Sequence, residues 1–423
     1  MSNKVDELDI VIIGGGLAGL TTAALLARAG KTVTLFEHSS RELGGRARTA
    51  EINGFYFNQG PHALYLTDAN DSIMREIGIT YTGGIPGLKG YLIKDGKKHE
   101  IAGGYSSWLS GKSDGSQFFI SPTKIDFSQL EGVTEQEWLD KNIHDKNDAE
   151  IIKTIFRLNT YGNDPDISSI GPVLHQIYVG SQAGVMYLDG GWQTLIDGLL
   201  TVAKNSNARI VMGKKAIKVK RTDSSSGWQV LLSDKIEVSA KIVVIAAGPN
   251  DAYSLFDDNE RPEVLSKAAK ESKPVRLVCL DVALSSLPDK DVTFALEVDR
   301  PLYYSVHSAY AKVAPEGGAL IHVAKYLGTS IQPKAREDQP ELEEFLDFLQ
   351  PGWRQVLVKK RPLPNMVVSN ALVTAADGGL RGRPEPRIAD NLYIVGDWVG
   401  KEGLLSNASV ASAKHASQLI LNE

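Results

Sequence analysis

The stretch IVIIGGGLAGLTTAALLA, Ile10 to Ala27, decides the fold of this chain. It opens with an apolar, β-branched run typical of a buried parallel strand, continues through three glycines, and ends in residues with high helix propensity. The run TVTLFE, at 32–37, predicts a second strand. We therefore expect a strand at 9–13, a helix at 17–29 and a strand at 32–37, joined as a right-handed βαβ unit.

The same stretch invites a second interpretation, because its 18 residues are uncharged and Gly15 and Gly19 have the spacing of a membrane dimerisation motif. A membrane helix is apolar along its whole length. Here a glycine cluster separates a β-rich half from a helix-like half, which favours a strand, a turn and a helix.

The glycines Gly14, Gly16 and Gly19 have the G-x-G-x-x-G spacing, and Glu37 follows 18 residues after the last of them. In this fingerprint the first glycine makes a tight turn, the second lets backbone approach a pyrophosphate, and the third packs helix on strand. The helix N-terminus offers free N–H groups to phosphate, and the acid accepts hydrogen bonds from ribose. A dinucleotide site is predicted.

A second glycine loop, RELGGRART at 41–49, follows within a few residues. An NAD domain would normally continue with another strand and helix. Instead, Gly44, Gly45 and Arg46 offer a second place where backbone and a cation can approach phosphate or ribityl oxygens. FAD is long enough to need two anchors, and no second G-x-G-x-x-G occurs in the sequence. We therefore expect FAD and no separate NAD(P)H domain.

The composition is that of a folded globular protein, with 42% hydrophobic and 23% charged residues and a net charge of −5. A nucleic-acid partner is not expected, because the one basic run, KKAIKVKR at 214–221, alternates with apolar residues like the solvated face of a strand. The eight histidines lack metal-binding spacings, so no metal site is expected.

The single cysteine, Cys279, lies in the apolar run VRLVCLDVAL, where it is interpreted as a small buried hydrophobe. No intrachain disulfide can form, and residues 1–8 contain no apolar signal region. We expect a cytoplasmic protein without a transmembrane segment. Peripheral contact with a membrane stays open, and the sequence does not indicate the oligomeric state.

The length of 423 residues exceeds the roughly 250–300 residues over which a single core keeps growing. The predicted class is α/β (α+β overall), with a Rossmann-like FAD-binding domain that is discontinuous in sequence and an inserted substrate domain of mixed sheet and helices. The FAD-binding domain is expected at 1–87, 189–255 and 385–423, and the substrate-binding domain at 88–188 and 256–384.

Local signals support this division. Asn53-Gly54 and Asp95-Gly96 suit hairpin turns, and Thr134 with Glu137 forms a capping box at a helix start. A serine-rich connection is expected at 222–227 and a closing helix near the C-terminus. Four aromatic residues in the second insert either pack in the core or line a pocket: Tyr303, Tyr304, Tyr326 and Trp353.

At these motifs the sequence resembles the superfamily of flavin-dependent amine oxidases, protoporphyrinogen oxidases and phytoene-desaturase-like proteins. Their R-x-x-G-G-R-x-x-[ST] motif is matched from Arg41 to Thr49. The segment FNQGPHALYL, at 57–66, is similar to a family segment that passes beside the flavin ring, with Asn58 in place of the usual acid. This departure puts a charge-dependent role there in doubt. The segments YLDGGWQTLIDGL and NLYIVGDW also match.

The resemblance implies that the strand around Ala216 contacts adenine, that Asp397 lies on the ribityl chain, and that the helix after Ser406 points its N-terminus at the flavin pyrimidine edge. Trp398 is a possible neighbour of the ring. The residues expected to bind FAD without a covalent link are Gly14, Gly16, Leu17, Ala18, Gly19, Glu37, His38, Gly44, Gly45, Arg46, Gly60, Pro61, His62, Ala216, Ile217, Gly396, Asp397, Leu404, Leu405 and Ala408.

Catalytic residues are not identified by the sequence. His62 is a candidate because it lies in a matched segment, and Lys325 because many amine oxidases of the family keep a lysine near flavin N5. The alternative for Lys325 is an ordinary solvent-facing strand lysine.

The function implied is an FAD-dependent oxidoreductase that moves a hydride from a small organic or apolar substrate, an amine, a porphyrinogen or a polyene, to flavin N5. Oxygen, a quinone or another diffusible acceptor would reoxidise the flavin. Two alternatives stay open. One is a flavin-dependent isomerase without net redox chemistry. The other is a non-catalytic binding protein on the scaffold of the GDP-dissociation inhibitors.

Overall fold

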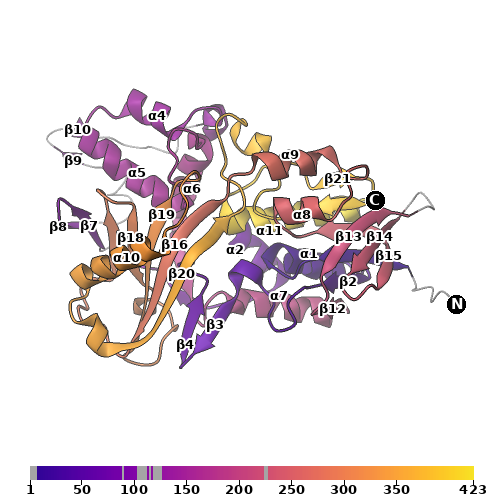
Figure 1. The fold of residues 1–423 in the computed structure, drawn as a ribbon, viewed down its shortest axis with the longest axis horizontal. Coiled ribbons are helices and arrows are strands. Elements are labelled where there is room, and N and C mark those ends of the chain that lie inside the picture. Colours follow the sequence, from indigo (N-terminus) through magenta and orange to yellow (C-terminus); the bar gives the residue numbers. More distant parts are fainter. Residues whose placement is uncertain (1–6, 88–89, 102–111, 114–115, 118–125, 223–226) are drawn as a thin grey trace.

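The computed structural model describes residues 7–87, 90–101, 112–113, 116–117, 126–222 and 227–423 (Figure 1). Most of the serine-rich connection, at 223–226, lies outside the described residues, as do the first six residues of the segment searched for a signal region. None of the described helices is both long and apolar enough to cross a membrane.

The first large sheet has eight strands and contains the predicted βαβ unit. Its strands, in spatial order, are β12 (Arg209–Val211), β2 (Val33–Phe36), β1 (Leu8–Ile13), β15 (Glu237–Ile245), β14 (Trp228–Leu232) and β13 (Ala216–Arg221), with β22 (Leu392–Ile394) beside β15 and β21 (Arg387–Ala389) beside β22. β1 runs parallel to both β2 and β15, and β15 runs parallel to β22. The Rossmann-like class is thereby confirmed.

Both faces of this sheet are covered. Ile10 and Ile12 of β1 pack in one core with helices on that face, whereas Val11 and Ile13 pack in a second core on the other face. This alternation explains why β1 is a continuous apolar run. The first face carries α1 (Leu17–Arg28), α2 (Ala69–Ile77), α7 (Gln193–Asn205) and α11 (Leu405–Leu421), and the second carries α8 (Pro249–Ser254) and α9 (Glu263–Glu271).

The second large sheet has seven strands. In spatial order they are β20 (Leu357–Ser369), β16 (Val275–Leu284), β19 (Ala319–Leu327), β18 (Leu302–Val306), β17 (Phe294–Glu297), β7 (Gly90–Lys94) and β8 (Lys97–Ile101). One face packs on α10 (Ala335–Leu349). The other packs on α4 (Glu135–Asn142), α5 (Lys146–Thr160) and α6 (Ile170–Ala183).

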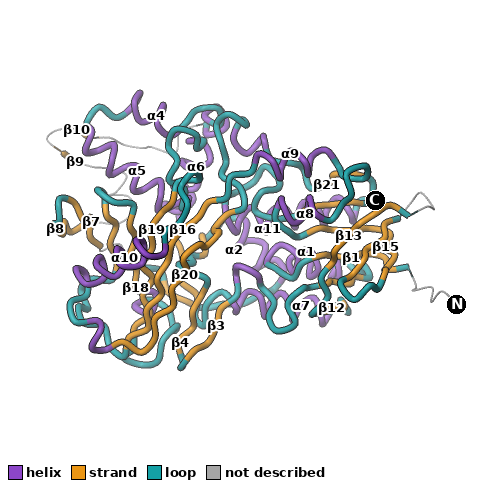
Figure 2. Tube along the Cα trace, in the orientation of Figure 1, coloured by secondary structure: helices purple, strands orange, loops and turns teal. Residues whose placement is uncertain are grey.

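The distribution of strands supports the predicted domain division, which stays a prediction in its boundaries. In Figure 1 the long strands β16 and β20 extend from the second sheet to the centre of the molecule, where α2 and α11 lie. Figure 2 shows loop segments in this central zone. The smaller elements are β3 (Thr49–Ile52) with β4 (Phe55–Asn58), β11 (Val185–Leu188) with β5 (Leu64–Tyr65) and β6 (Gly83–Gly84), and β9 (Lys112–Ser113) with β10 (Ser116–Gln117).

Several local predictions are confirmed. The hairpins turn at Asn53-Gly54 and Asp95-Gly96. At the start of α4 the amide of Glu137 donates to the Thr134 hydroxyl at 3.1 Å, and the amide of Thr134 donates to the Glu137 carboxylate at 2.9 Å. This reciprocal pair satisfies two N–H groups that the first turn of the helix would leave without partners.

Candidate functional site

A cavity of about 940 Å³ lies between the two sheets. One part adjoins the carboxyl ends of β1, β2, β15 and β22, where open parallel sheets bind their ligands. The other part is lined by residues of α5, α6, β17 and β18. Both sheets therefore contribute walls to one continuous space.

The first glycine loop has the geometry that the fingerprint requires. Gly14 has φ +107°, and a Cβ there would lie 2.5 Å from the Ala246 carbonyl oxygen. A Cβ on Gly19 would lie 2.0 Å from the Gly14 carbonyl oxygen, so helix and loop can pack only without it. A Cβ on Gly16 would meet no atom within 4 Å. Gly16 thus leaves an open approach to backbone beside the start of α1.

The carboxylate of Glu37 is buried beneath this loop. One oxygen accepts a hydrogen bond of 2.6 Å from the Gly15 amide, and the other accepts one of 2.8 Å from the Ser39 amide. His38 Nδ1 lies 2.7 Å from the second oxygen. Glu37 also lines the cavity. Its contact with a ribose stays a prediction, but its role in fixing the glycine loop follows from these bonds.

The second glycine loop docks directly on the first. The Gly44 amide donates to the Gly15 carbonyl at 2.8 Å, and Gly16 and Gly44 pair as a short parallel bridge. Gly44 and Gly45 both have positive φ values, +104° and +55°, which suit glycine. After this turn a single 3₁₀ turn, Gly45–Ala47, brings Arg46 to the cavity wall.

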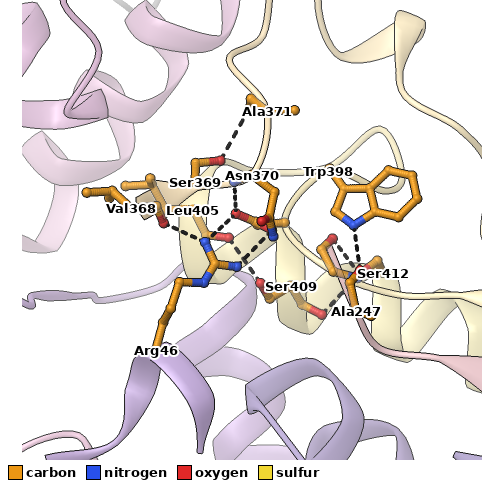
Figure 3. Close-up of polar contacts among 12 residues, drawn as sticks. Arg46, Ala247, Val368, Ser369, Asn370, Ala371, Trp398, Leu405, Ser409 and Ser412 are labelled. Atoms are coloured by element: carbon orange, nitrogen blue, oxygen red, sulfur yellow. Dashed lines mark hydrogen bonds and ion pairs between the residues drawn. The ribbon is translucent and has the colours of Figure 1, made fainter. Parts of the chain in front are cut away.

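Arg46 connects three segments that are far apart in sequence. Its Nη1 and Nη2 donate to the two carboxylate oxygens of Asp397 at 2.9 and 3.0 Å, and Nη1 also donates to the Val368 carbonyl at 2.8 Å. Asn370 donates to the same carboxylate from its backbone amide at 2.8 Å and from Nδ2 at 2.7 Å. Figure 3 shows Arg46 reaching from its helical turn toward Val368 and Asn370.

The charge state of Asp397 follows from these contacts. Burial by itself would raise its pKa, but the Arg46 guanidinium and the hydrogen bonds from Arg46 and Asn370 outweigh burial and lower the pKa of Asp397 to about 2. The carboxylate is therefore ionised at neutral pH. Its negative charge balances Arg46 at the point where the two sheets meet.

His62 is held between its own segment and the second glycine loop. Its Nδ1 lies 3.1 Å from the Gly60 carbonyl oxygen and its Nε2 lies 3.1 Å from the Arg46 carbonyl oxygen. The ring meets Trp192 edge-on at 5.0 Å. Burial lowers the pKa of His62 to about 4 despite these carbonyls, so the ring is neutral at pH 7 and carries one N–H. It can therefore donate to only one of the two carbonyls at a time.

Most of the predicted cofactor-binding residues line the cavity. They are Gly14, Gly16, Leu17, Ala18, Glu37, His38, Gly44, Gly45, Arg46, Pro61, His62, Ala216, Gly396, Asp397 and Leu405. Their shared position supports the predicted set, and their contacts with a cofactor stay a prediction.

Five predicted residues do not line the cavity. Gly19 and Ala408 are buried against neighbouring backbone and helices, and Leu404 packs with Val373 and Leu380. Ile217 is 43% exposed because side chains alternate along β13, so only its neighbour Ala216 faces the site. The remaining one is Gly60, which lies beside Met366 and Cys279.

Two residues that were candidates for a place near the flavin ring, Lys325 and Trp398, do not line the cavity. Lys325 does not line the cavity, since its Nζ donates to Asp338 at 2.8 Å and to Glu341 at 2.7 Å, both on α10. The lysine points to the face of its sheet that packs on α10. Trp398 does not line the cavity either, because its indole donates to the Ala247 carbonyl at 3.0 Å within the core of the first domain.

Sequence reasoning missed most of the walls of the second part of the cavity. Of the four aromatic residues singled out, only Tyr303 lines the cavity, and the other three are buried in the core. The aromatic and apolar side chains found there are Tyr65, Ile85, Leu158, Tyr161, Tyr187, Phe294, Tyr303 and Met366. They come from seven separate segments, so no local sequence pattern predicts that they line one cavity.

Charge is distributed unevenly along the cavity. The charged side chains that line it are Glu37, Arg46, Lys214, Lys215, Asp251 and Asp397, all near the first sheet. Among the described residues, the second part has no Asp, Glu, Lys or Arg in its wall and offers only neutral polar groups such as Gln59, Asn159 and Gln182. This part can hold a neutral ligand at a lower desolvation cost than a charged one.

A buried polar cluster lies behind the segment 57–62. Asp281 accepts from the Cys279 thiol at 3.2 Å and from His322 Nδ1 at 2.6 Å, and its other oxygen pairs with Arg361. Cys279 is buried, as predicted, and burial raises the pKa of its thiol. Because Arg361 already neutralises the carboxylate, the cluster acts as an ion-pair network. Arg361 also donates to the Asn58 carbonyl and so anchors the segment that carries His62.

Comparisons with known proteins agree with this architecture. Residues 12–77 match the family model described as an NAD(P)-binding Rossmann-like domain. A curated relative, 4,4'-diapolycopen-4-al dehydrogenase of Metabacillus indicus, is 23% identical over 280 residues, which cover 56% of this chain and 55% of the relative. The chain thus spans about half the length of the curated relatives it matches.

Solved structures match over almost the whole chain. An oxidoreductase from Methanosarcina mazei has a TM-score of 0.73 at 18% identity, covering 98% of this chain and 100% of its own. A double mutant of putrescine oxidase has a TM-score of 0.74 at 14% identity, covering 99% of each chain. Together the matches confirm the predicted resemblance to flavin amine oxidases and phytoene-desaturase-like proteins, and the solved structures show that the chain shares their two-domain fold.

Proposed function

We propose that this chain is an FAD-dependent oxidoreductase whose cofactor extends along the cavity from Glu37 to the N-terminus of α11. The observation that carries the proposal is the single cavity that joins the two glycine loops, Asp397 and the start of α11. NAD would need only the first loop. The docking of the second loop on the first, through Gly44 and Gly15, favours a longer dinucleotide.

The residues present fit FAD. Gly16 leaves space for a pyrophosphate next to the free amides at the start of α1, and the Arg46 side chain is 42% exposed at the cavity wall. The first turn of α11 contains no acidic residue and lines the cavity through Leu405, Ser406 and Asn407, so the helix presents its partial positive charge there. When bound, FAD supplies the acceptor for a hydride at N5 of its ring.

The chain's own residues would position and shield the reacting groups. Arg46 balances negative charge, and the neutral His62 and Trp192, which meet edge-on, form a wall of the cavity beside the second glycine loop. Tyr161 donates to the Pro61 carbonyl at 3.3 Å. This bond connects the second part of the cavity, which we propose as the substrate part, to the segment 57–62. These contacts exclude water and hold a substrate near the cofactor.

The wall of the substrate part favours a neutral, apolar substrate. An ammonium group binds most favourably beside a carboxylate, and the carboxylates of a porphyrinogen beside cations. The described residues supply neither in this part. Aromatic rings and Met366 offer instead a surface for extended apolar groups. Of the three substrate classes, a polyene fits best, in keeping with the name of the relative from Metabacillus indicus.

Anaerobic reduction of the bound flavin tests this function. The purified protein is mixed under argon with a polyene, a primary amine or a porphyrinogen, and the absorbance of oxidised flavin near its visible maximum is followed. We expect bleaching by the polyene alone. Bleaching by the amine or the porphyrinogen would contradict the substrate class. Turnover of a substrate without consumption of any acceptor would indicate an isomerase, and a chain that binds no flavin would indicate the non-catalytic alternative.

A further inference from the structure

Two tyrosines in the wall of the substrate part, Tyr187 and Tyr303, lie beside a buried serine, Ser305. Tyr303 and Ser305 are two residues apart on β18, so their side chains project from the same face of the sheet. Tyr303 packs there with residues of α5 and α6. Burial raises the pKa of Tyr187 to about 12, and the nearby hydroxyls of Tyr303 and Ser305 oppose the rise. The three hydroxyls therefore lie close together.

The hydroxyl of Ser305 is an orphan. The residue is 1% exposed, and its Oγ forms no hydrogen bond with the described residues. A buried hydroxyl without a partner is costly, and such groups are rare in native proteins. Because the two neighbouring tyrosines line the cavity, a ligand that binds their hydroxyls can complete a hydrogen-bond network that includes Ser305.

Ring contacts hold both tyrosines in place. Tyr187 stacks on the buried ring of His307, with ring centroids 3.8 Å apart and an interplanar angle of 14°. Tyr303 meets Phe294 edge-on, with centroids 5.7 Å apart at 85°. The phenol rings are thus fixed before a ligand arrives, so binding to their hydroxyls loses little side-chain entropy.

The surroundings of the tyrosine pair are apolar. Phe294 and Met366 belong to the same hydrophobic cluster as Tyr303, and both line the cavity. The described residues place no acidic or basic side chain in this part of the wall. A carboxylate or an ammonium group would be desolvated here without a counter-ion. A neutral oxygen can instead accept hydrogen bonds from the tyrosine hydroxyls.

We propose that the hydroxyls of Tyr187 and Tyr303 bind a neutral oxygen, an alcohol or a carbonyl, that is carried by an otherwise apolar substrate. Ser305 is a positioning residue in this site. Its hydroxyl donates to a tyrosine oxygen and so leaves both tyrosine hydrogens for the ligand. This inference rests on the proposed function and deepens it, because it distinguishes an oxygenated polyene from a hydrocarbon.

Binding of matched polyenes tests the proposal. The probes are conjugated tetraenes of equal chain length that end in a methyl group, a primary alcohol, an aldehyde or a carboxylate. Their Kd values for the purified protein are measured by equilibrium dialysis under argon. Any bound flavin is reduced beforehand by light in the presence of EDTA, so that it cannot accept a hydride. The carboxylate should bind the wild type at least about tenfold more weakly than the alcohol does. Equal binding of these two probes would overturn the proposal.

Three variants, Tyr187→Phe, Tyr303→Phe and Ser305→Ala, each remove one hydroxyl and little else. We expect each variant to weaken binding of the alcohol, the aldehyde or both about three- to tenfold, the effect of one neutral hydrogen bond. The probe that responds identifies the oxygen that the site takes. Binding of the methyl-ended probe should not change. Wild-type affinity for both oxygenated probes in all three variants, or an equal loss for the methyl-ended probe, would overturn the proposal.

Ser305→Ala supplies a second readout, the Tm. Because the Ser305 hydroxyl has no partner in the free protein, its removal should not lower the Tm, although the oxygenated probes bind more weakly. A lower Tm with unchanged affinities would identify a purely structural hydroxyl and overturn the role of Ser305.

Tyr304→Phe is the matched control. Tyr304 is the neighbour of Tyr303 on β18, but it points to the opposite face, where its hydroxyl donates to the Val292 carbonyl at 3.0 Å. It does not line the cavity, so its loss should leave all the affinities unchanged. Flavin content separates the two proposals. Protein that contains flavin but whose variants bind every probe like the wild type refutes this inference alone. Flavin-free protein whose variants still lose the oxygenated probes refutes the proposed function alone.

Discussion

The amide of Gly44 donates a 2.8 Å hydrogen bond to the carbonyl of Gly15, and this bond joins the two glycine loops of the chain. The first loop presents Gly16 and the N-terminus of α1, and the second presents Arg46. The two loops thus form one continuous part of the cavity wall, which we propose binds the anionic phosphates of the cofactor. This arrangement explains why a chain with a complete dinucleotide fingerprint carries a second glycine motif.

Gly44→Ala should weaken both the contact between the two glycine loops and the binding of the cofactor. The residue has φ +104°, and a Cβ there would lie 3.0 Å from the Ile196 side chain. Strain of this kind costs about 1–3 kcal/mol, and relief by movement of the loop would displace Arg46. We expect FAD affinity to fall about tenfold. Gly78→Ala is the control, since Gly78 has φ +89° with no atom within 4 Å of a new Cβ and lies outside the cavity wall. Equal losses of FAD affinity in both variants would contradict the assignment.

Gly16→Val should abolish cofactor retention while the apoprotein stays folded. Gly16 has an ordinary φ of −77°, and a side chain there meets only open space on the path of the pyrophosphate. The fold therefore loses little. Flavin content after purification and the Tm of the apoprotein are the two measurements. Gly132→Val, at an exposed glycine that also has no neighbour within 4 Å, should leave flavin content unchanged. Stoichiometric flavin in Gly16→Val would refute the position of the pyrophosphate.

Ile85→Asp should lower kcat/KM for the substrate and leave cofactor binding unchanged. Ile85 lines the substrate part of the cavity and is 53% exposed, so a charge there adds a desolvation cost for an apolar ligand without disrupting the core. We expect kcat/KM for a polyene to fall at least tenfold at constant flavin content. Ile331→Asp is matched in chemistry and exposure, at 51%, but lies outside the cavity wall. A similar loss in both variants would show that the effect is not specific to the cavity.

Glu135 should make stability depend on pH. Burial raises the pKa of its carboxyl to about 7, while a hydrogen bond with Ser168 and the charge of Arg157 oppose the shift. The folded state then binds more protons than the unfolded state between pH 4.5 and 7, so this contribution to stability is lost as pH rises. Glu135→Gln removes the titration.

The free energy of unfolding of Glu135→Gln, relative to the wild type, should therefore increase by about 2–3 kcal/mol between pH 4.5 and pH 8. Urea unfolding at the two pH values measures it. His62 acts in the opposite direction, because its pKa is lowered to about 4 and its contribution to stability is lost as pH falls from 6.5. The comparison with wild type cancels that contribution. A difference that does not change with pH would contradict an elevated pKa of Glu135.

The sequence predicts what local chemistry determines. The fingerprint requires particular backbone at Gly14 and Gly19, and both positions indeed exclude a Cβ. The capping box at Thr134 and the hairpin turns likewise depend on a few adjacent residues. These signals are short-range, so a single sequence contains them.

The rest depends on contacts between distant segments. β20 was not predicted. Pro362 and Pro364 are unfavourable in a central strand, but β20 is the edge of its sheet, so its prolines need no ladder partner on the open side. Whether Lys325 faces the cavity or α10 depends on which side of the sheet each element packs, and the sequence of β19 does not encode this. Asn370 was not predicted as a site residue, because its partner Asp397 is 27 residues away and their contact has no local sequence signal.

The central proposal, one FAD molecule spanning both glycine loops, is tested most directly by the cofactor content of the purified wild-type protein. The protein is denatured with acid, and the released nucleotide is identified by chromatography and quantified against protein. We predict about one FAD per chain, released without proteolysis and therefore not covalently bound. Recovery of NAD or NADP in its place, or a chain that neither carries FAD nor binds it on titration, would contradict the proposal.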